Sequence, residues 1–244
     1  MSKNLLVLST AGRLHWLKGA VETFEKTLND PLAIPWDLLV IDDATPDEIG
    51  IRDFCKEHGI AFVTKERPSG LINSWNLAYQ YFMSNGYKFC ILSNDDVRIP
   101  RRFSRGFLDG LRKFDIIGPV SNDPGVSKDQ KTARFTSMQP KEGNIDKIQY
   151  DISHKYHKHD RYQPIRDVNG FCFGFSRSAK KFEFSEGLLF DPKHANYDGE
   201  FDLCRRVQRR HGKIAIAKTA YVYHYKRGTY RELGKLKKRQ QLWR

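Results

Sequence analysis

Residues 89–97 constrain the fold most strongly, because an apolar run ends there in two adjacent carboxylates. The run Phe-Cys-Ile-Leu is followed at once by Ser-Asn-Asp-Asp, which ends in Asp95 and Asp96. A short apolar run with this ending is typical of a buried parallel strand, and open α/β sheets bind ligands beyond the carboxyl ends of such strands. Carboxylate oxygens at that place suit Mg²⁺ or Mn²⁺ that also holds a phosphate. The alternative is that Asn94, Asp95 or Asp96 only caps a helix that begins after Pro100.

Strands and helices are expected to alternate over the first half of the chain. Apolar runs predict strands at residues 4–9, 37–41, 60–64, 89–92 and 115–120, and stretches with apolar residues at helical spacing separate them. This pattern predicts an α/β fold, with a mostly parallel central sheet flanked by helices, in one domain over residues 1–225. Right-handed crossovers bring the carboxyl ends of parallel strands to one edge. We therefore expect Thr10, the pair Asp42 and Asp43, and residues 94–96 to lie close together.

Residues 121–163 lack this periodicity and are rich in polar and charged side chains. A long connection inside a compact domain is commonly functional, so we expect a variable loop on the acceptor side that is mobile and orders over bound substrate. His154, His157 and His159 lie in it, but no predicted helix or strand fixes them as a metal site. Order returns in a predicted strand at residues 168–175, a helix that closes at His211, and strands at residues 213–217 and 220–225.

The net charge of +13, from 42 Lys and Arg against 29 Asp and Glu, is the most unusual global property. It predicts a polyanionic partner, such as nucleic acid, an anionic membrane or an acidic polymer. The alternative is that the excess charge only keeps the protein soluble. Residues 226–244 form a basic C-terminal tail whose single acid is Glu232, and this tail is expected to contribute to binding of a polyanion.

The sequence contains no apolar run near the roughly 20 residues that span a bilayer. The N-terminus lacks the basic and apolar segments of a signal peptide, and the four cysteines are scattered without a C-x-x-C pair. These features predict a cytoplasmic protein with reduced cysteines, either free or peripheral at a membrane.

Several motifs, in order along the chain, resemble those of the inverting nucleotide-sugar glycosyltransferases of family 2, which have the GT-A fold. The segment ending in Asn94, Asp95 and Asp96 is similar to the Asp-x-Asp signature, with asparagine in the first place. Residues 200–205, Glu-Phe-Asp-Leu-Cys-Arg, resemble the segment that carries the catalytic base. The remaining motifs lie at residues 9–13, 40–47, 168–171 and 221–224.

The resemblance implies a role for each matching residue. Glu200 is expected to be the catalytic base, with Asp202 as the second choice and Asp198 as the third. Asp96 and His224 are expected to hold Mn²⁺ or Mg²⁺. The residues expected to bind the nucleotide-sugar donor are Thr10, Arg13, Asp42, Asp43, Gly70, Asn76, Asn94, Asp95 and Gly170.

The function implied by the resemblance is metal-dependent, inverting transfer of a sugar from a nucleotide-diphosphate donor to a hydroxyl. The expected acceptor is a glycan or lipid-linked glycan. Two alternatives stay open: transfer to hydroxymethylated bases of DNA, and a non-catalytic, basic nucleic-acid-binding protein on the same scaffold. A nucleotidyltransferase is disfavoured, because the sequence shows no glycine-rich N-terminal phosphate loop with a following lysine.

Overall fold

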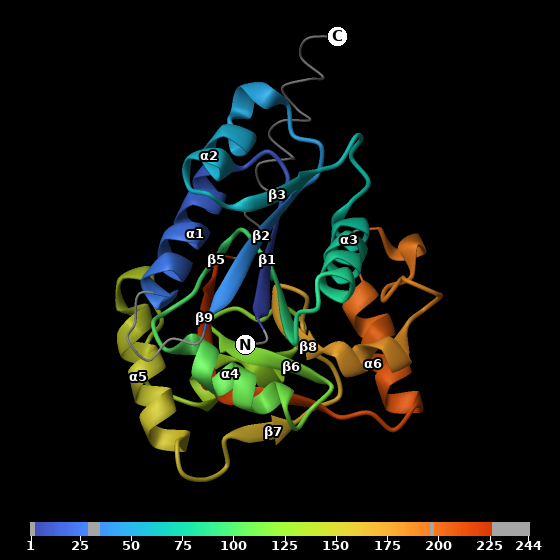
Figure 1. Ribbon diagram of the computed structural model, residues 1–244. Helices are drawn as coiled ribbons and strands as arrows, with labels where there is room; N and C mark the ends of the chain where they lie inside the picture. Colours follow the sequence, from blue (N-terminus) through green and yellow to red (C-terminus); the bar gives the residue numbers. More distant parts are fainter. Residues whose placement is uncertain (1–2, 29–34, 196–197, 226–244) are drawn as a thin grey trace.

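The computed structural model describes residues 3–28, 35–195 and 198–225. Strands and helices alternate along this part of the chain and build one layered α/β structure (Figure 1). In chain order the strands and α-helices are β1 (Asn4–Thr10), α1 (Leu14–Leu28), β2 (Trp36–Asp42), α2 (Ile51–Glu57), β3 (Ala61–Thr64), α3 (Leu71–Ser84), β4 (Phe89–Asn94), β5 (Val97–Arg98), α4 (Phe103–Leu111), β6 (Ile116–Ser121), α5 (Ile145–Tyr156), β7 (Tyr162–Pro164), β8 (Cys172–Ser176), α6 (Gly199–Arg209) and β9 (Ile214–His224).

The central sheet has the strand order β3-β2-β1-β4-β8-β6-β9-β5, and β7 pairs with β9. The predicted parallel arrangement is confirmed for β1, β2, β3 and β4, and β6 also runs parallel to β9. Strand β8 lies antiparallel between β4 and β6, and β5 and β7 lie antiparallel to β9. The sheet is therefore mixed, with a parallel N-terminal half.

Alternation along the strands divides the core between the two faces of the sheet. Leu6 and Leu8 of β1 pack with α1, whereas Leu5 and Val7 pack with α3 on the other face. This follows from the two-residue period of a strand, which sends successive side chains to opposite faces. The consequence can be followed in Figure 1: α1, α2 and α4 cover one face of the sheet and α3 and α6 cover the other, whereas α5 packs against β9.

The polar ends of the parallel strands meet at one edge of the sheet, as predicted. Thr10 at the end of β1 is paired in register with Asp42 at the end of β2, and Ser9 is paired with Asn94 at the end of β4. Because β1 lies between β2 and β4, the three strand ends form one continuous edge.

Residues 121–163 contain a helix, so the expectation that no element fixes this segment is wrong. Helix α5 buries Ile148 and Ile152 in a small cluster with Ile216 and Tyr221 of β9. Gln149 lies between them, donates to the carbonyl of Thr219 at 2.7 Å and accepts from the backbone N–H of Tyr221 at 2.8 Å. The apolar stripe is short, and this buried glutamine interrupts it, which explains why the sequence pattern did not predict a helix.

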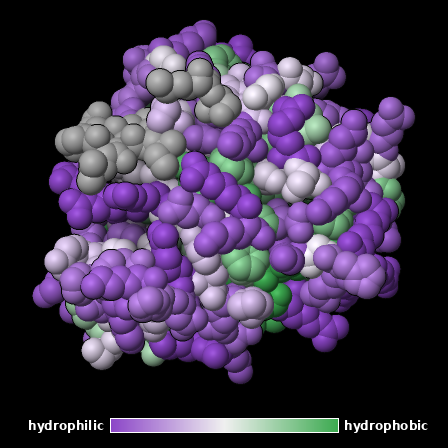
Figure 2. Space-filling view, turned by 60° about the horizontal axis from the view of Figure 1, so that its bottom comes forward, coloured by the Kyte–Doolittle hydropathy of each residue, from purple (hydrophilic) through white to green (hydrophobic). Residues whose placement is uncertain are grey.

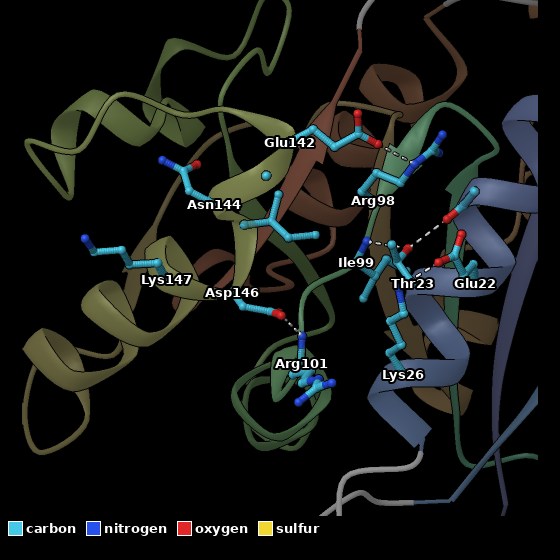
Figure 3. Close-up of a pocket in the computed structure, with 13 residues that line it drawn as sticks. Glu22, Thr23, Lys26, Arg98, Ile99, Arg101, Glu142, Asn144, Asp146 and Lys147 are labelled. Carbon is cyan, nitrogen blue, oxygen red and sulfur yellow. Dashed lines mark hydrogen bonds and ion pairs between the residues drawn. The ribbon is translucent and has the colours of Figure 1, made fainter.

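The start of α5 faces α1 across a pocket of about 620 Å³ (Figure 3). Arg98 of β5 pairs with Glu142 at 3.2 Å, and the backbone N–H of Arg101 donates to Asp146 at 2.8 Å. One contact attaches the 3₁₀ turn Glu142–Asn144 to β5, and the other attaches the first turn of α5 to the segment between β5 and α4. Glu22 and Lys26 of α1, which also line the pocket, form a second ion pair at 2.7 Å.

Two further details of the elements depart from the simple pattern. The segment between β2 and β3 forms a short 3₁₀ turn, Asp47–Ile49, and then α2, because Gly50 adopts a left-handed conformation with φ of +77° between them. The two strands predicted at residues 213–217 and 220–225 are the single strand β9, whose pairing with β6 shifts register between Pro119 and Val120.

Candidate active site

Asp96 and His224 face one another where β5 pairs with the end of β9. Their closest atoms, Asp96 Oδ1 and His224 Nε2, lie 3.5 Å apart. His224 Nδ1 is 2.8 Å from the backbone carbonyl of Asp123, which can only accept, so Nδ1 carries a proton and the ring is held with Nε2 toward Asp96. Burial alone would raise the pKa of Asp96, but the neighbouring His224 and the positive charge of Arg13 hold it below its usual value.

The residues at the end of β4 carry the types of atom that a divalent cation prefers. Asn94 Oδ1 and Asp96 Oδ1 are buried oxygens that have no hydrogen-bond partner among the described residues. Hard cations prefer such carboxylate and amide oxygens, and His224 Nε2 is directed to the same place. No group of three or more His, Cys, Asp or Glu side chains with metal-binding geometry occurs in the described part of the chain. Mg²⁺ and Mn²⁺ do not require one, because water and substrate phosphates complete their coordination.

The carboxylate of Asp95 is bound to other residues than those around Asp96 and His224, and it is completely buried. It accepts from Thr10 Oγ1 at 2.7 Å and forms an ion pair with Arg13. Burial raises the pKa of Asp95, and the positive charge of Arg13 opposes that rise. The cluster of Thr10, Arg13 and Asp95 thus ties the loop after β1 to the end of β4.

Asp42 and Asp43 organise the turns that follow β2. Asp42 accepts from the backbone N–H of Thr45 at 3.0 Å, and Thr45 Oγ1 in turn accepts from the N–H of Gly12 at 2.7 Å. Burial is the main cause of a raised pKa at Asp42. These bonds join the loops after β1 and β2, the two loops that flank the shared edge.

Asp43 holds the loop before α3. Its carboxylate accepts from the backbone N–H groups of Ser69 and Gly70, at 2.9 and 3.2 Å, and pairs with Lys65 at 2.5 Å. Lys65 also donates to the carbonyl of Gly70 at 3.0 Å. The sequence alone does not indicate this role of Lys65. Lys65 follows β3 whereas its partner Asp43 follows β2, so only the folded sheet brings them together.

Asn76 lies further along α3 and is also buried. Its side-chain amide donates to the carbonyl of Phe190 at 3.0 Å and accepts from the N–H of the same residue at 2.9 Å. Both polar groups of the side chain are therefore engaged in attaching α3 to the segment before α6.

Gly170 and Phe171 connect the end of β4 to α6 and to His224. The carbonyl of Phe171 accepts from the backbone N–H of Asn94 at 2.9 Å, and its ring stacks on His224 with centroids 4.9 Å apart. The N–H of Gly170 donates to Glu200 Oε1 at 3.1 Å. A Cβ atom at Gly170 would lie 2.7 Å from Trp75 and 2.9 Å from Glu200 Oε1, so the close approach requires glycine.

Glu200 and Asp202 lie in the first turn of α6 but have different surroundings. Burial raises the pKa of Glu200, although N–H groups that include Gly170 oppose the rise. Asp202 pairs with Arg206 at 3.0 Å, and Arg206 also donates to the carbonyl of Leu189 at 2.8 Å. Asp198 is exposed and precedes the helix with φ of +63°. A carboxylate with a raised pKa suits a base better than one held by an arginine.

Buried polar atoms without a partner gather around these residues. Native proteins pair nearly all such atoms, so a concentration of unpaired ones marks a place where water, an ion or a ligand completes the bonds. At the strand ends and beside Gly170, the atoms without a partner among the described residues are Ser9 Oγ, Arg13 Nε and Nη1, Trp75 Nε1, Asn94 Oδ1 and Asp96 Oδ1. Together with Glu200 they define the candidate active site.

The basic tail, residues 226–244, lies outside the described residues, so its predicted role stays a prediction. Within the described residues, no helix has the length and apolar character needed to cross a membrane.

Known proteins give a match in structure only. No protein-family model matches the sequence, and no curated protein does. GalNAc-T7, in a crystal structure with UDP, GalNAc and Mn²⁺, matches with a TM-score of 0.62 and 14% identity, over 92% of this chain and 44% of that protein. Residues 1–349 of S. aureus TarS match with a TM-score of 0.55 and 15% identity, over 97% of this chain and 64% of the other.

A second structure of S. aureus TarS matches with a TM-score of 0.55 and 14% identity, over 92% of this chain and 36% of that one. This chain thus spans less than two thirds of each of these solved chains. At such low identity the likeness concerns the fold. The fold of this chain is the GT-A fold of glycosyltransferases.

Proposed function

We propose that this protein is an inverting glycosyltransferase that moves a sugar from a nucleotide-diphosphate donor to a hydroxyl group. The observation that carries the proposal is the grouping of Asp96, His224 and Glu200 around Phe171 and Gly170, beside unpaired buried polar atoms. Crystallised GalNAc-T7, which shares this fold, holds UDP and Mn²⁺. A sugar nucleotide that contains UDP is therefore the first donor class to test.

Glu200 is proposed as the catalytic base. Its carboxylate takes the proton of the acceptor hydroxyl as the oxygen attacks the anomeric carbon of the sugar, and the bond from that carbon to the diphosphate oxygen breaks. The products are the glycosylated acceptor and the nucleoside diphosphate. The bond from the Gly170 N–H fixes one oxygen of Glu200, which orients the carboxylate before substrate binds.

Asp96 and His224 are proposed to hold Mn²⁺ or Mg²⁺, with Asn94 contributing its unpaired oxygen. When bound, the cation would neutralise negative charge on the departing diphosphate. Asp96 is ready for this role, because its lowered pKa keeps it ionised. His224 is oriented by Asp123, and its ring is supported by Phe171.

The residues around this centre are proposed to shape the donor pocket. Nε and Nη1 of Arg13 are buried at the same edge of the sheet and have no hydrogen-bond partner among the described residues, which suits them to phosphate oxygens. Asp42, Asp43 and Gly70 set the loops that border the edge. Asp95 acts through Arg13 and Thr10, which it holds in place.

The proposed acceptor is a hydroxyl of a glycan or lipid-linked glycan. A hydroxymethylated base of DNA is the second candidate, and the net charge of +13 is the observation that favours it. Either acceptor presents an alcohol that Glu200 could deprotonate. We therefore propose that the protein surface around the reacting atoms decides whether a glycan or DNA is the acceptor.

A donor-hydrolysis screen tests the proposal. The full chain is incubated with UDP-sugars and other nucleotide sugars, with Mn²⁺ or EDTA, and release of the nucleoside diphosphate is measured. We expect Mn²⁺-dependent release from one donor class and little from the Glu200→Gln variant. Absence of release and of binding for every nucleotide sugar would contradict the proposal and leave a non-catalytic protein on this fold.

A further inference from the structure

A second pocket, of about 450 Å³, lies between α4 and α5 and uses none of the candidate active-site residues. The first turn of α4, the exposed side of α5 and the loop before β7 form its walls. The side chains that line it and enter the following argument are Arg102, Arg105, Asp109, Tyr150, Arg161 and Thr219.

Arginine side chains line this pocket. Among the described residues its one lining carboxylate is Asp109, which is shared by Arg161 at 3.1 Å and by Arg112 at 3.5 Å. Arg105 is exposed and has no ion-pair partner within residues 3–28, 35–195 and 198–225. The positive charge of Arg105 therefore favours an anionic ligand with several oxygen acceptors.

Buried polar groups of the lining lack partners as well. Thr219 is only 4% exposed, and its hydroxyl has no hydrogen-bond partner among the described residues. The Nε of Arg161 is likewise buried and unpaired. Unpaired buried donors of this kind are uncommon in native structures, and both lie in the lining of one pocket. Water or the oxygens of a ligand would complete the bonds of these groups.

Aromatic rings form one wall of the pocket. Tyr150 stacks on His154 with centroids 5.9 Å apart and planes at 12°, and His154 stacks on His157 at 5.4 Å and 22°. Tyr150 is 62% exposed, so its ring is open to a partner. The result is a supported ring, accessible to solvent, beside an arginine-lined pocket. Single-stranded nucleic acids bind through this combination of stacked bases and paired phosphates.

The surroundings do not suit a lipid surface. The exposed large hydrophobic residues among the described ones are Ile49, Val126, Tyr150 and Phe184, and Tyr150 alone lines the pocket. Figure 2 shows the side of the molecule that lies at the bottom of Figure 1, and this side is mainly hydrophilic with small, separate hydrophobic patches. Insertion into a bilayer needs a contiguous apolar face.

We propose that the pocket between α4 and α5 binds single-stranded nucleic acid, with a base stacked on Tyr150 and the adjoining phosphate held by Arg105 and Arg161. This activity is independent of the nucleotide-sugar chemistry at Glu200. The pocket would be a binding site for a polyanion on the folded domain, separate from the basic tail.

The test is fluorescence anisotropy with the full chain and two labelled oligomers of equal length, oligothymidine and its abasic counterpart. Wild type should bind oligothymidine more tightly than the abasic strand. Tyr150→Ala should weaken oligothymidine binding by about 5- to 150-fold and remove the preference, whereas Tyr150→Phe should keep it. Arg105→Ala should weaken binding to both strands and make the slope of log K against log salt shallower by about 0.7.

Arg52→Ala, an exposed arginine on α2, is the matched control for loss of one charge. Thermal unfolding should be unchanged in all variants, because Arg52, Arg105 and Tyr150 are exposed. Equal losses for Arg52→Ala and Arg105→Ala would overturn the proposal, since binding would then follow net charge alone. Equal wild-type affinity for both strands would also overturn it, as would binding to phosphatidylglycerol vesicles without binding to oligothymidine.

Discussion

Glu200 Oε1 accepts a hydrogen bond from the backbone N–H of Gly170 at 3.1 Å, in a position where any Cβ on residue 170 would collide with the carboxylate. The bond joins α6 to the segment that follows on to β8 and contacts Asn94 through Phe171. The position of the proposed base relative to the end of β4 is therefore set by backbone atoms. Such a contact survives substitution of neighbouring side chains.

Replacing Glu200 by glutamine should lower turnover by about 10²–10⁴-fold and leave donor affinity nearly unchanged. Glutamine keeps an oxygen for the Gly170 N–H but cannot take a proton. Asp202→Asn is the matched control on the same helix. It weakens the pair with Arg206, so its main effect should be a lower melting temperature. Steady-state kinetics and thermal unfolding separate the two effects, and a larger kinetic loss for Asp202→Asn would show that Asp202 is the base.

The pH dependence of stability should also identify Glu200. Burial raises its pKa in the folded protein above the reference value of 4.5. The folded state therefore binds this proton more tightly than the unfolded state, and the resulting stability is present below 4.5 and is lost as the pH rises through the folded pKa. Glutamine at this position is uncharged at every pH of interest, so this titration is absent from the Glu200→Gln variant.

We expect Glu200→Gln to unfold at a higher temperature than wild type at neutral pH, with a difference that shrinks as the pH is lowered toward 4.5. Wild-type turnover should fall at acid pH with an apparent pKa above 4.5, because Glu200 must be ionised to act as a base. Melting curves of both proteins across this range provide the measurement. A variant that is less stable than wild type at neutral pH would contradict the pKa assignment.

The grouping of the strand ends could be predicted from the sequence because it depends on local signals. Apolar runs that stop in polar residues identify the parallel strands, and parallel strands place their carboxyl ends on one edge. Thr10, Asp42 and Asn94 meet there for that reason alone. The glycine at position 170 was also identifiable, since glycine within a strand pattern commonly marks close backbone approach.

Other features depend on contacts between distant segments. Asp95 and Asp96 are adjacent and chemically alike in sequence, yet one is enclosed by Thr10 and Arg13 while the other faces His224. The different surroundings of Asp95 and Asp96 arise only when the loop after β1, which carries Arg13, folds against the end of β4. The antiparallel insertion of β8 beside β4 is likewise a long-range pairing that no local pattern specifies.

The pair of Arg13 and Asp95 should respond to substitution as a unit. Both side chains are buried, so Arg13→Met leaves an uncompensated carboxylate and should lower the free energy of unfolding by about 3–5 kcal/mol. The double variant Arg13→Met with Asp95→Leu removes both charges and should recover much of that loss. Urea unfolding of the two single variants and the double variant measures the coupling. Additive losses would mean that the pair contributes no mutual stabilisation.

Asp96→Asn should remove the effect of Mn²⁺ on nucleotide binding. Asp96 Oδ1 is buried, has no hydrogen-bond partner among the described residues and lies 3.5 Å from His224 Nε2, so the proposed cation would depend on this carboxylate. Isothermal titration with UDP should give wild-type binding that is tighter with Mn²⁺ than with EDTA by about tenfold or more, a difference that the variant loses. Asp53→Asn, an exposed carboxylate on α2, should behave like wild type. If Asp96→Asn keeps the full Mn²⁺ effect and normal turnover, Asp96 does not hold the cation, and the metal assignment fails even though Glu200 could still be the base.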